Sequence, residues 1–242
     1  MKISIIIPAF NEEKLLPATL AAVQESMKSF QLRKWPCEII VCDNNSTDQT
    51  AVIATATGAR VVFEPVNQIG RARNCGAASA TGEWLMFVDA DSRPTPELFA
   101  RTGEVIEADT HLAGGCLLTL DQQSAWAKPF EWLWGLASRL NHWAAGSFIF
   151  VRREAFEAIG GFDVSLFASE EIDLSIRLNR LARKQGRPKM HIIKTPRMIT
   201  SGRKLNLYSK GEHLAFVLRA ALTGGRSLRK RDQCAIWYDG RR

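Results

Sequence analysis

The chain has 242 residues, 46% hydrophobic and 24% charged, an ordinary soluble composition that is ample for one large core. It has no apolar run long enough to span a membrane, no secretory signal pattern and five cysteines without a CxxC pair, so we expect a cytoplasmic protein with reduced thiols. The net charge is +7, and from Lys189 onward thirteen basic residues accompany three acidic ones. This segment is either a solubilising tail or a contact for phosphates on a nucleotide, a membrane surface or nucleic acid.

Strands and helices alternate through the first half of the chain. Apolar runs predict strands at 3–7, 38–42, 60–63 and 84–88. Cap residues and helical spacing predict helices at 11–30, 46–57, 70–80 and 95–109. The first is capped by Asn11, the second by a capping box of Ser46 and Gln49, and the last by Thr95 before Pro96. This alternation predicts an α/β fold with a mostly parallel, doubly wound sheet flanked by helices.

The second half is less regular. The sequence predicts strands at 117–120, 148–151 and 190–194, and helices at 124–143, 170–184 and 207–221. There is no internal repeat and no linker, so we expect one domain over 1–242. The helix at 124–143 carries four tryptophans, Trp126, Trp132, Trp134 and Trp143, which suit a core, an acceptor site or a membrane interface.

Polar side chains follow three of the predicted strands. Asn11, Asp43 and the pair Asp89 and Asp91 stand just after strands that end at the same edge of a parallel sheet, where such sheets bind ligands. Any one of these loops could be a turn or a helix cap. Two carboxylates this close repel each other, and a hard divalent cation between them would relieve the repulsion.

The segment GRARNCG at 70–76 opens a predicted helix, whose N-terminus attracts anions. The chain contains neither a Walker A motif nor a GxGxxG fingerprint, which argues against a P-loop NTPase and a nicotinamide-dependent enzyme.

Seven motifs follow one another along nearly the whole chain: IIIPAFNE (5–12), DNNSTD (43–48), GRARNCG (70–76), DAD (89–91), FIFVRR (148–153), GGFD (160–163) and EEIDL (170–174). In this order and spacing, they resemble those of the inverting glycosyltransferases of family 2, which have the GT-A fold. It implies a transfer of a sugar, of the hexosyl type, from a nucleotide-diphosphate donor to a hydroxyl acceptor that is a sugar or lipid-linked. Residues 1–115 would form the donor half, and 116–242 the acceptor half with its basic C-terminal segment.

The resemblance also implies roles for single residues. Asp43 would contact the nucleotide base, and Asp89 the ribose or the metal, while Asp91 would ligate Mn²⁺ or Mg²⁺. A third metal ligand would be His191 or His213. Arg203 or Lys204 would reach the leaving diphosphate from a mobile loop. The other expected donor-site residues are Pro8, Phe10, Asn11, Glu12, Asn45, Gly70, Arg73 and Ala90.

The family's catalytic base lies in an acidic pair, which here is Glu170 and Glu171. Glu171 stands where the family usually has Asp and is the expected base, with Glu170 in reserve. Stabilising charge at a helix N-terminus is the alternative role for both.

Two other functions stay open. A nucleotidyltransferase that forms sugar nucleotides would need a Gly-rich loop after the first strand, and a non-catalytic nucleotide-sugar-binding protein would lack the acidic residues. Near the C-terminus, Gln233 and Trp237 match the QxxRW signature of processive synthases, but Ile236 replaces its arginine, which favours single transfer. We expect no nucleic acid partner. We expect a cytoplasmic enzyme that binds peripherally to the inner face of a membrane.

Overall fold

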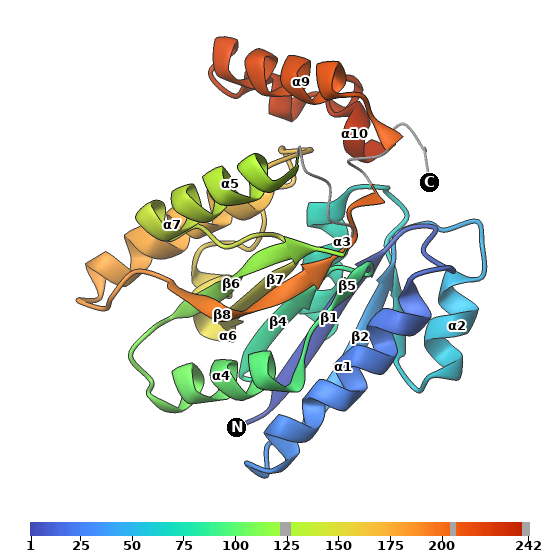
Figure 1. Cartoon of the computed structure of the whole chain (residues 1–242). Coiled ribbons are helices and arrows are strands. Elements are labelled where there is room, and N and C mark those ends of the chain that lie inside the picture. The colour runs from blue at the N-terminus through green and yellow to red at the C-terminus, as the bar shows by residue number, and fades with distance from the viewer. Residues whose placement is uncertain (122–126, 204–206, 239–242) are drawn as a thin grey trace.

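The structure, a computed structural model, describes residues 1–121, 127–203 and 207–238 and centres on an eight-stranded sheet (Figure 1). Its strand order is β3-β2-β1-β4-β7-β6-β8-β5. The strands are β1 (Ile3–Ala9), β2 (Cys37–Asp43), β3 (Arg60–Phe63), β4 (Trp84–Val88), β5 (Ser92–Arg93), β6 (Ala113–Leu120), β7 (Phe148–Arg152) and β8 (His191–Thr200).

The sheet is parallel from β3 through β2 and β1 to β4, as the alternation of strands and helices predicts. All residues of β1 and β4 are buried, because helices cover both faces of this part of the sheet. The predicted α/β fold is therefore confirmed. The pattern did not predict that β7 runs antiparallel between β4 and β6, or that β5 pairs antiparallel with β8 at the edge.

Helices cover the two faces in separate layers. Helices α1 and α4 pack with the side chains of Ile5 and Met86 on one face. Helices α3, α6 and α7 pack with Ile6 and Phe87 on the other. The helices are α1 (Leu16–Gln31), α2 (Thr50–Ala56), α3 (Ile69–Ser79), α4 (Pro96–Glu107), α5 (Ala127–Asn141), α6 (Arg153–Ala158), α7 (Glu170–Lys184), α9 (Lys210–Leu222) and α10 (Ala235–Tyr238), with 3-10 turns η1 (Arg226–Arg229) and η2 (Arg231–Gln233).

Two of the predicted helix caps are wrong. Helix α1 begins at Leu16, and the side-chain oxygen of Asn11 instead accepts a hydrogen bond from the backbone N–H of Thr47 at 2.8 Å. Helix α2 begins at Thr50, and the Ser46 hydroxyl accepts from the backbone N–H of Asn11 at 3.0 Å. These two hydrogen bonds join the loop after β1 to the loop after β2 and fix their relative positions. The Thr95 cap of α4 is confirmed.

Several boundaries in the second half differ from the prediction. Strand β8 runs six residues beyond the expected end at Lys194, and α9 begins at Lys210 behind a capping box of Ser209 and Glu212. Helix α5 is described from Ala127, so Ser124 and Trp126 lie outside the described residues. Among the residues that the structure describes, no helix is long and apolar enough to cross a membrane.

Candidate active site

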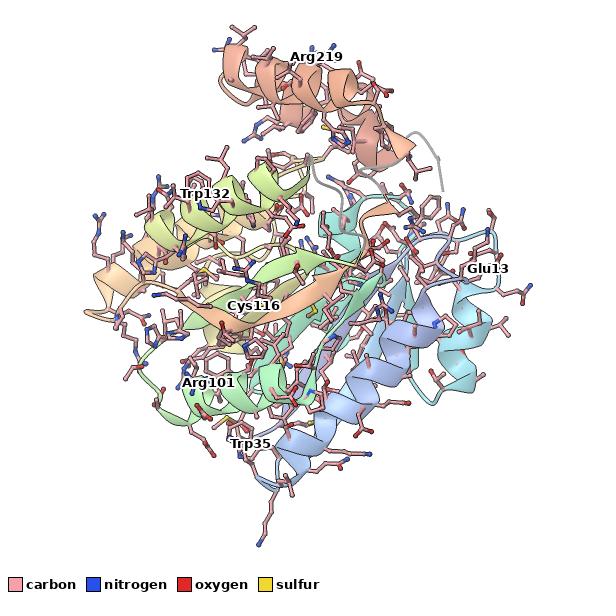
Figure 2. The ribbon with its side chains drawn as sticks, viewed as in Figure 1. Glu13, Trp35, Arg101, Cys116, Trp132 and Arg219 are labelled. Atoms are coloured by element: carbon pink, nitrogen blue, oxygen red, sulfur yellow. The ribbon has the colours of Figure 1, made fainter. Side chains whose placement is uncertain are left out.

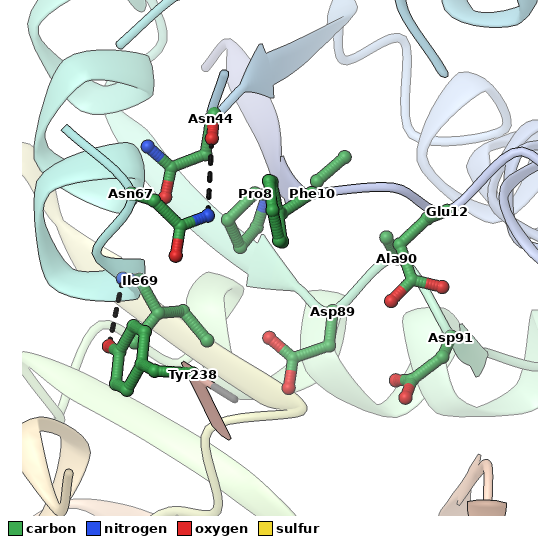
Figure 3. A pocket seen from close by; sticks show the side chains of 11 residues that line it. Pro8, Phe10, Glu12, Asn44, Asn67, Ile69, Asp89, Ala90, Asp91 and Tyr238 are labelled. Atoms are coloured by element: carbon green, nitrogen blue, oxygen red, sulfur yellow. Dashed lines mark hydrogen bonds between the residues drawn. The ribbon is translucent and has the colours of Figure 1, made fainter. Parts of the chain in front are cut away.

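A pocket lies at the carboxyl edge of the parallel strands (Figure 3). Six of the residues expected at the donor site line it, so the loops after β1 and β4 converge as predicted. These six are Pro8, Phe10, Glu12, Asp89, Ala90 and Asp91. Five further residues line the pocket without having been predicted: Ala9, Asn44, Asn67, Ile69 and Tyr238.

The other expected donor-site residues lie around this pocket without lining it. The carboxylate of Asp43 accepts the backbone N–H of Ser46 at 3.0 Å, and Asn11 and Asn45 adopt left-handed backbone conformations with φ of 52° and 67°. A Cβ added to Gly70 would lie 3.6 Å from the Cβ of Phe162, so this glycine faces the protein interior.

Asn44 is the residue that the loop after β2 contributes to the pocket wall. Its side-chain amide donates hydrogen bonds to the backbone carbonyls of Glu64 and Val66, at 3.1 and 2.7 Å, and thereby fixes the loop after β3. Asn67 from that loop lies opposite Asp89 in Figure 3. The DNNSTD motif, which contains Asn44, gave the signal for this wall, but not which of its side chains forms it.

Arg73 on α3 joins the loop after β4 to the start of α7. Its side chain is 1% exposed, and its guanidinium lies 2.6 Å from the carboxylate of Glu170 and 2.8 Å from that of Asp89. It also donates to the carbonyl of Gly146 at 3.0 Å. Burial lowers the pKa of Arg73, but the charges of Asp89 and Glu170 outweigh that effect and raise it, so the side chain stays charged.

A second pocket adjoins the first and shares Ile69 and Asp89 with it. The predicted acidic pair lies in its wall. Burial, and then the charge of Glu170, raise the pKa of Glu171 to about 8. Its lining residues also include Arg73, Leu118, Leu120, Glu131, Trp134, Ala145, Gly146, Ser147, Ser169, Thr200 and Ser201.

The tryptophans of α5 have different surroundings. Trp134 lines the second pocket, whereas the side chain of Trp132 is 65% exposed. Periodicity alone did not separate these environments, because they depend on where α5 lies against the sheet.

Asp89 and Asp91 supply oxygen ligands of the kind that Mn²⁺ and Mg²⁺ prefer. Within 1–121, 127–203 and 207–238, no group of three His, Cys, Asp or Glu residues is placed to hold a metal. Mg²⁺ is commonly bound through one or two carboxylates together with substrate phosphates and water, so two protein carboxylates are sufficient. The residues present therefore fit a hard divalent cation that a diphosphate helps to bind.

The remaining candidates are Arg203, expected near the diphosphate, and the two histidines considered as metal ligands; Arg203 lies beside the pocket, and the histidines do not. The guanidinium of Arg203 lies 2.8 Å from the carboxylate of Glu12 and 4.0 Å from that of Asp91, two residues that line the pocket. Lys204 lies outside the described residues. His191 contacts His111 at the start of β8, far along that strand from Asp91, and His213 packs on Tyr208. Neither histidine is placed as a third metal ligand.

The chain matches the family model "Glycosyl transferase family 2" over residues 4–160, and it belongs to that family. An uncharacterized glycosyltransferase of Mycobacterium tuberculosis is 38% identical over 89 residues, 37% of this chain and 36% of that protein. An undecaprenyl-phosphate 4-deoxy-4-formamido-L-arabinose transferase of Serratia proteamaculans is 31% identical over 137 residues, 52% of this chain and 39% of that protein. The matched regions thus span less than half the length of these two relatives.

Among solved structures, a mannosyltransferase from Pyrobaculum calidifontis in complex with GDP-Man and Mn²⁺ superposes with a TM-score of 0.66 at 20% identity, covering 94% of this chain and 62% of that one. The likeness shows that the chain has the GT-A fold, which confirms the fold expected from the sequence resemblance.

Proposed function

We propose that the chain is an inverting, metal-dependent glycosyltransferase that transfers a sugar from a nucleotide-diphosphate donor to a hydroxyl acceptor in a single transfer. The observation that carries this proposal is the contact of buried Arg73 with both Asp89 and Glu170, at the junction of two adjoining pockets. Donor and acceptor would meet at that junction. Residues 1–115 would form most of the donor side and 116–242 most of the acceptor side.

On the donor side, the pocket at the carboxyl ends of β1 and β4 would hold the nucleoside diphosphate. Asp43 would contact the base, and Asp89 and Asp91 would hold Mn²⁺ or Mg²⁺. Such an ion supplies charge neutralisation for the leaving diphosphate. The guanidinium of Arg203, 2.8 Å from Glu12, adds a positive charge beside the same pocket.

On the acceptor side, Glu171 would take the proton from the attacking hydroxyl. Its raised pKa, about 8, makes it a stronger base than an ordinary carboxylate while it remains partly ionised near neutral pH. Glu170 is held 2.6 Å from Arg73, which leaves Glu171 as the member of the pair better suited to accept a proton. Attack from this pocket, opposite the leaving diphosphate, would invert the configuration of the sugar carbon.

The alternative functions have less support. The loop after β1 reads Pro8-Ala9-Phe10-Asn11 and has no glycine, which a nucleotidyltransferase would need for its phosphate loop. Asp89, Asp91 and Glu171 all line the two pockets, which a non-catalytic binding protein would not require. The undecaprenyl-phosphate transferase among the relatives supports a lipid-linked acceptor as one class to test.

The test is a calorimetric titration of the purified chain with UDP, GDP and CDP, each with and without Mn²⁺, followed by an assay for nucleotide-sugar hydrolysis. We expect one nucleotide to bind, with Mn²⁺ increasing its affinity, and the corresponding nucleotide sugar to be slowly hydrolysed. Absence of binding by all three nucleotides would overturn the proposal. Release of pyrophosphate from a nucleoside triphosphate would replace it with the nucleotidyltransferase function.

A further inference from the structure

Helix α9 carries apolar side chains on two faces. Its inner face holds the half-buried side chains of Phe216 and Ala220. The outer stripe, as we call its second apolar face, follows the i, i+3, i+4, i+7, i+8 spacing of a continuous helix face. Its four large members are 51–86% exposed. The outer stripe consists of Leu214, Val217, Leu218, Ala221 and Leu222.

A helix that is apolar around most of its circumference is usually covered by protein or lipid. With thirteen residues, α9 is too short to span a bilayer. It therefore has the dimensions of a helix that lies in the plane of a membrane surface, with its outer apolar side chains among the lipids.

The segment that contains α9 is strongly basic. Between residues 210 and 238 there are six basic residues and two acidic ones. A solubilising tail would carry this charge without an aliphatic stripe, whereas here charge and stripe occur together. The basic residues are Lys210, Arg219, Arg226, Arg229, Lys230 and Arg231, and the acidic residues are Glu212 and Asp232.

This segment is fixed to the body of the protein close to the candidate active site. The carbonyl of Leu228 accepts the backbone N–H of Phe167 at 2.7 Å. The hydroxyl of Tyr238 accepts the backbone N–H of Ile69 at 3.3 Å, and both residues line the donor pocket. Figure 1 shows α9 as the outermost helix beyond this edge of the sheet, and Figure 2 shows exposed Trp132 of α5 on the same side.

We propose that the outer stripe of α9 and the basic residues that follow it form a surface that binds an anionic lipid bilayer. Acyl chains would cover the outer stripe, and lipid phosphates would neutralise Arg226 and Lys230. A second copy of the chain fits less well, because pairing two outer stripes would bring together two basic segments on chains that each carry a net charge of +7. The surface lies outside residues 4–160, and lipid binding does not rest on the proposed reaction.

The experiment is cosedimentation of the full chain with vesicles of phosphatidylcholine, with or without phosphatidylglycerol. We expect binding only to the vesicles that contain phosphatidylglycerol, and we expect it to weaken as salt is added. The double variant Arg226→Gln/Lys230→Gln should bind about 30-fold less tightly, at about 1 kcal/mol for each basic residue. Its control, Lys34→Gln/Lys184→Gln, removes two exposed lysines elsewhere and should bind like the wild type.

The apolar part is tested separately with Leu218→Gln/Leu222→Gln, which should lower lipid binding by at least about tenfold. Leu32→Gln is its matched control, because Leu32 is 87% exposed and Leu222 is 86% exposed. This control should leave binding unchanged.

Three results would overturn the proposal. The first is a wild-type chain that stays in the supernatant with phosphatidylglycerol vesicles. The second is a control variant that loses as much lipid binding as the test variant with which it is paired. The third is a dimer in sedimentation velocity that Leu218→Gln/Leu222→Gln dissociates without affecting lipid binding, which would assign the outer stripe to a second copy. The charge and apolar variants are independent, so a folding defect in one leaves the other as a test.

Discussion

Replacing Arg73 with methionine tests whether its contacts hold the two halves of the site together. The substitution retains a long apolar side chain but removes the only positive charge that the structure places within 3 Å of Glu170 among the described residues. Glu170 is 3% exposed and would lose a partner at 2.6 Å. Breaking one side of a buried ion pair costs about 3–5 kcal/mol, so we expect a loss of that order in the free energy of unfolding.

The assay is urea denaturation at neutral pH. Lys28→Met is the matched control, since Lys28 lies 2.5 Å from Glu25 while both side chains are more than half exposed. That pair should contribute less than about 1 kcal/mol. Adding Glu170→Gln to Arg73→Met should recover part of the loss, because a buried amide needs no counter-charge. A loss for Arg73→Met no larger than that of Lys28→Met, with no coupling to Glu170, would refute the reasoning.

Three further predictions concern the chemistry of the site. Glu171→Gln should lower the turnover number by about 10²–10⁴-fold without changing nucleotide affinity, and the wild-type kcat/KM should rise with pH and level off above about 8, as the base loses its proton. A wild-type pH profile that is flat from pH 6 to 9 would argue against Glu171 as the base. Asp91→Asn should remove the increase that Mn²⁺ gives to nucleotide affinity in calorimetry, and a retained increase would place the metal elsewhere. Gly146→Ala should cost about 1–3 kcal/mol in urea denaturation, because its Cβ would lie 2.8 Å from the Arg73 guanidinium, and a neutral result would show that Arg73 can shift.

Local patterns predicted the first half of the fold well. The apolar runs that became β1 and β4 are buried along their whole length, and a run covered on both faces reads as a parallel strand without further information. The predicted starts of helices were wrong where a polar side chain could bond either to its own helix or to another loop. Asn11 and Ser46 have the chemistry of helix caps, but in the folded chain they bond to each other's loop, a contact between residues 35 positions apart.

The same limit applies to the candidate site. The local pattern placed Asp89 and Asp91 after a strand end, where parallel sheets bind ligands. It gave Glu170 and Glu171 only as charge at a helix N-terminus, and the resemblance to the family 2 glycosyltransferases singled out Glu171 as the expected base. Tyr238 could not be found in this manner. It reaches the pocket at the carboxyl edge of the parallel strands from α10, 169 residues beyond its partner Ile69, and the sequence between them sets no distance.

The sequence by itself determined the class of fold, the alternation of strands and helices, and which acidic residues follow the strand ends and open the later helix, because these depend on periodicity and residue type. Only the tertiary structure decided which of those acids are paired. It brought buried Arg73 between Asp89 and Glu170, and so distinguished Glu170, which is paired, from Glu171, whose pKa burial raises. It also turned the outer stripe of α9 toward solvent. Such pairings depend on the packing of distant segments, which local sequence patterns do not encode.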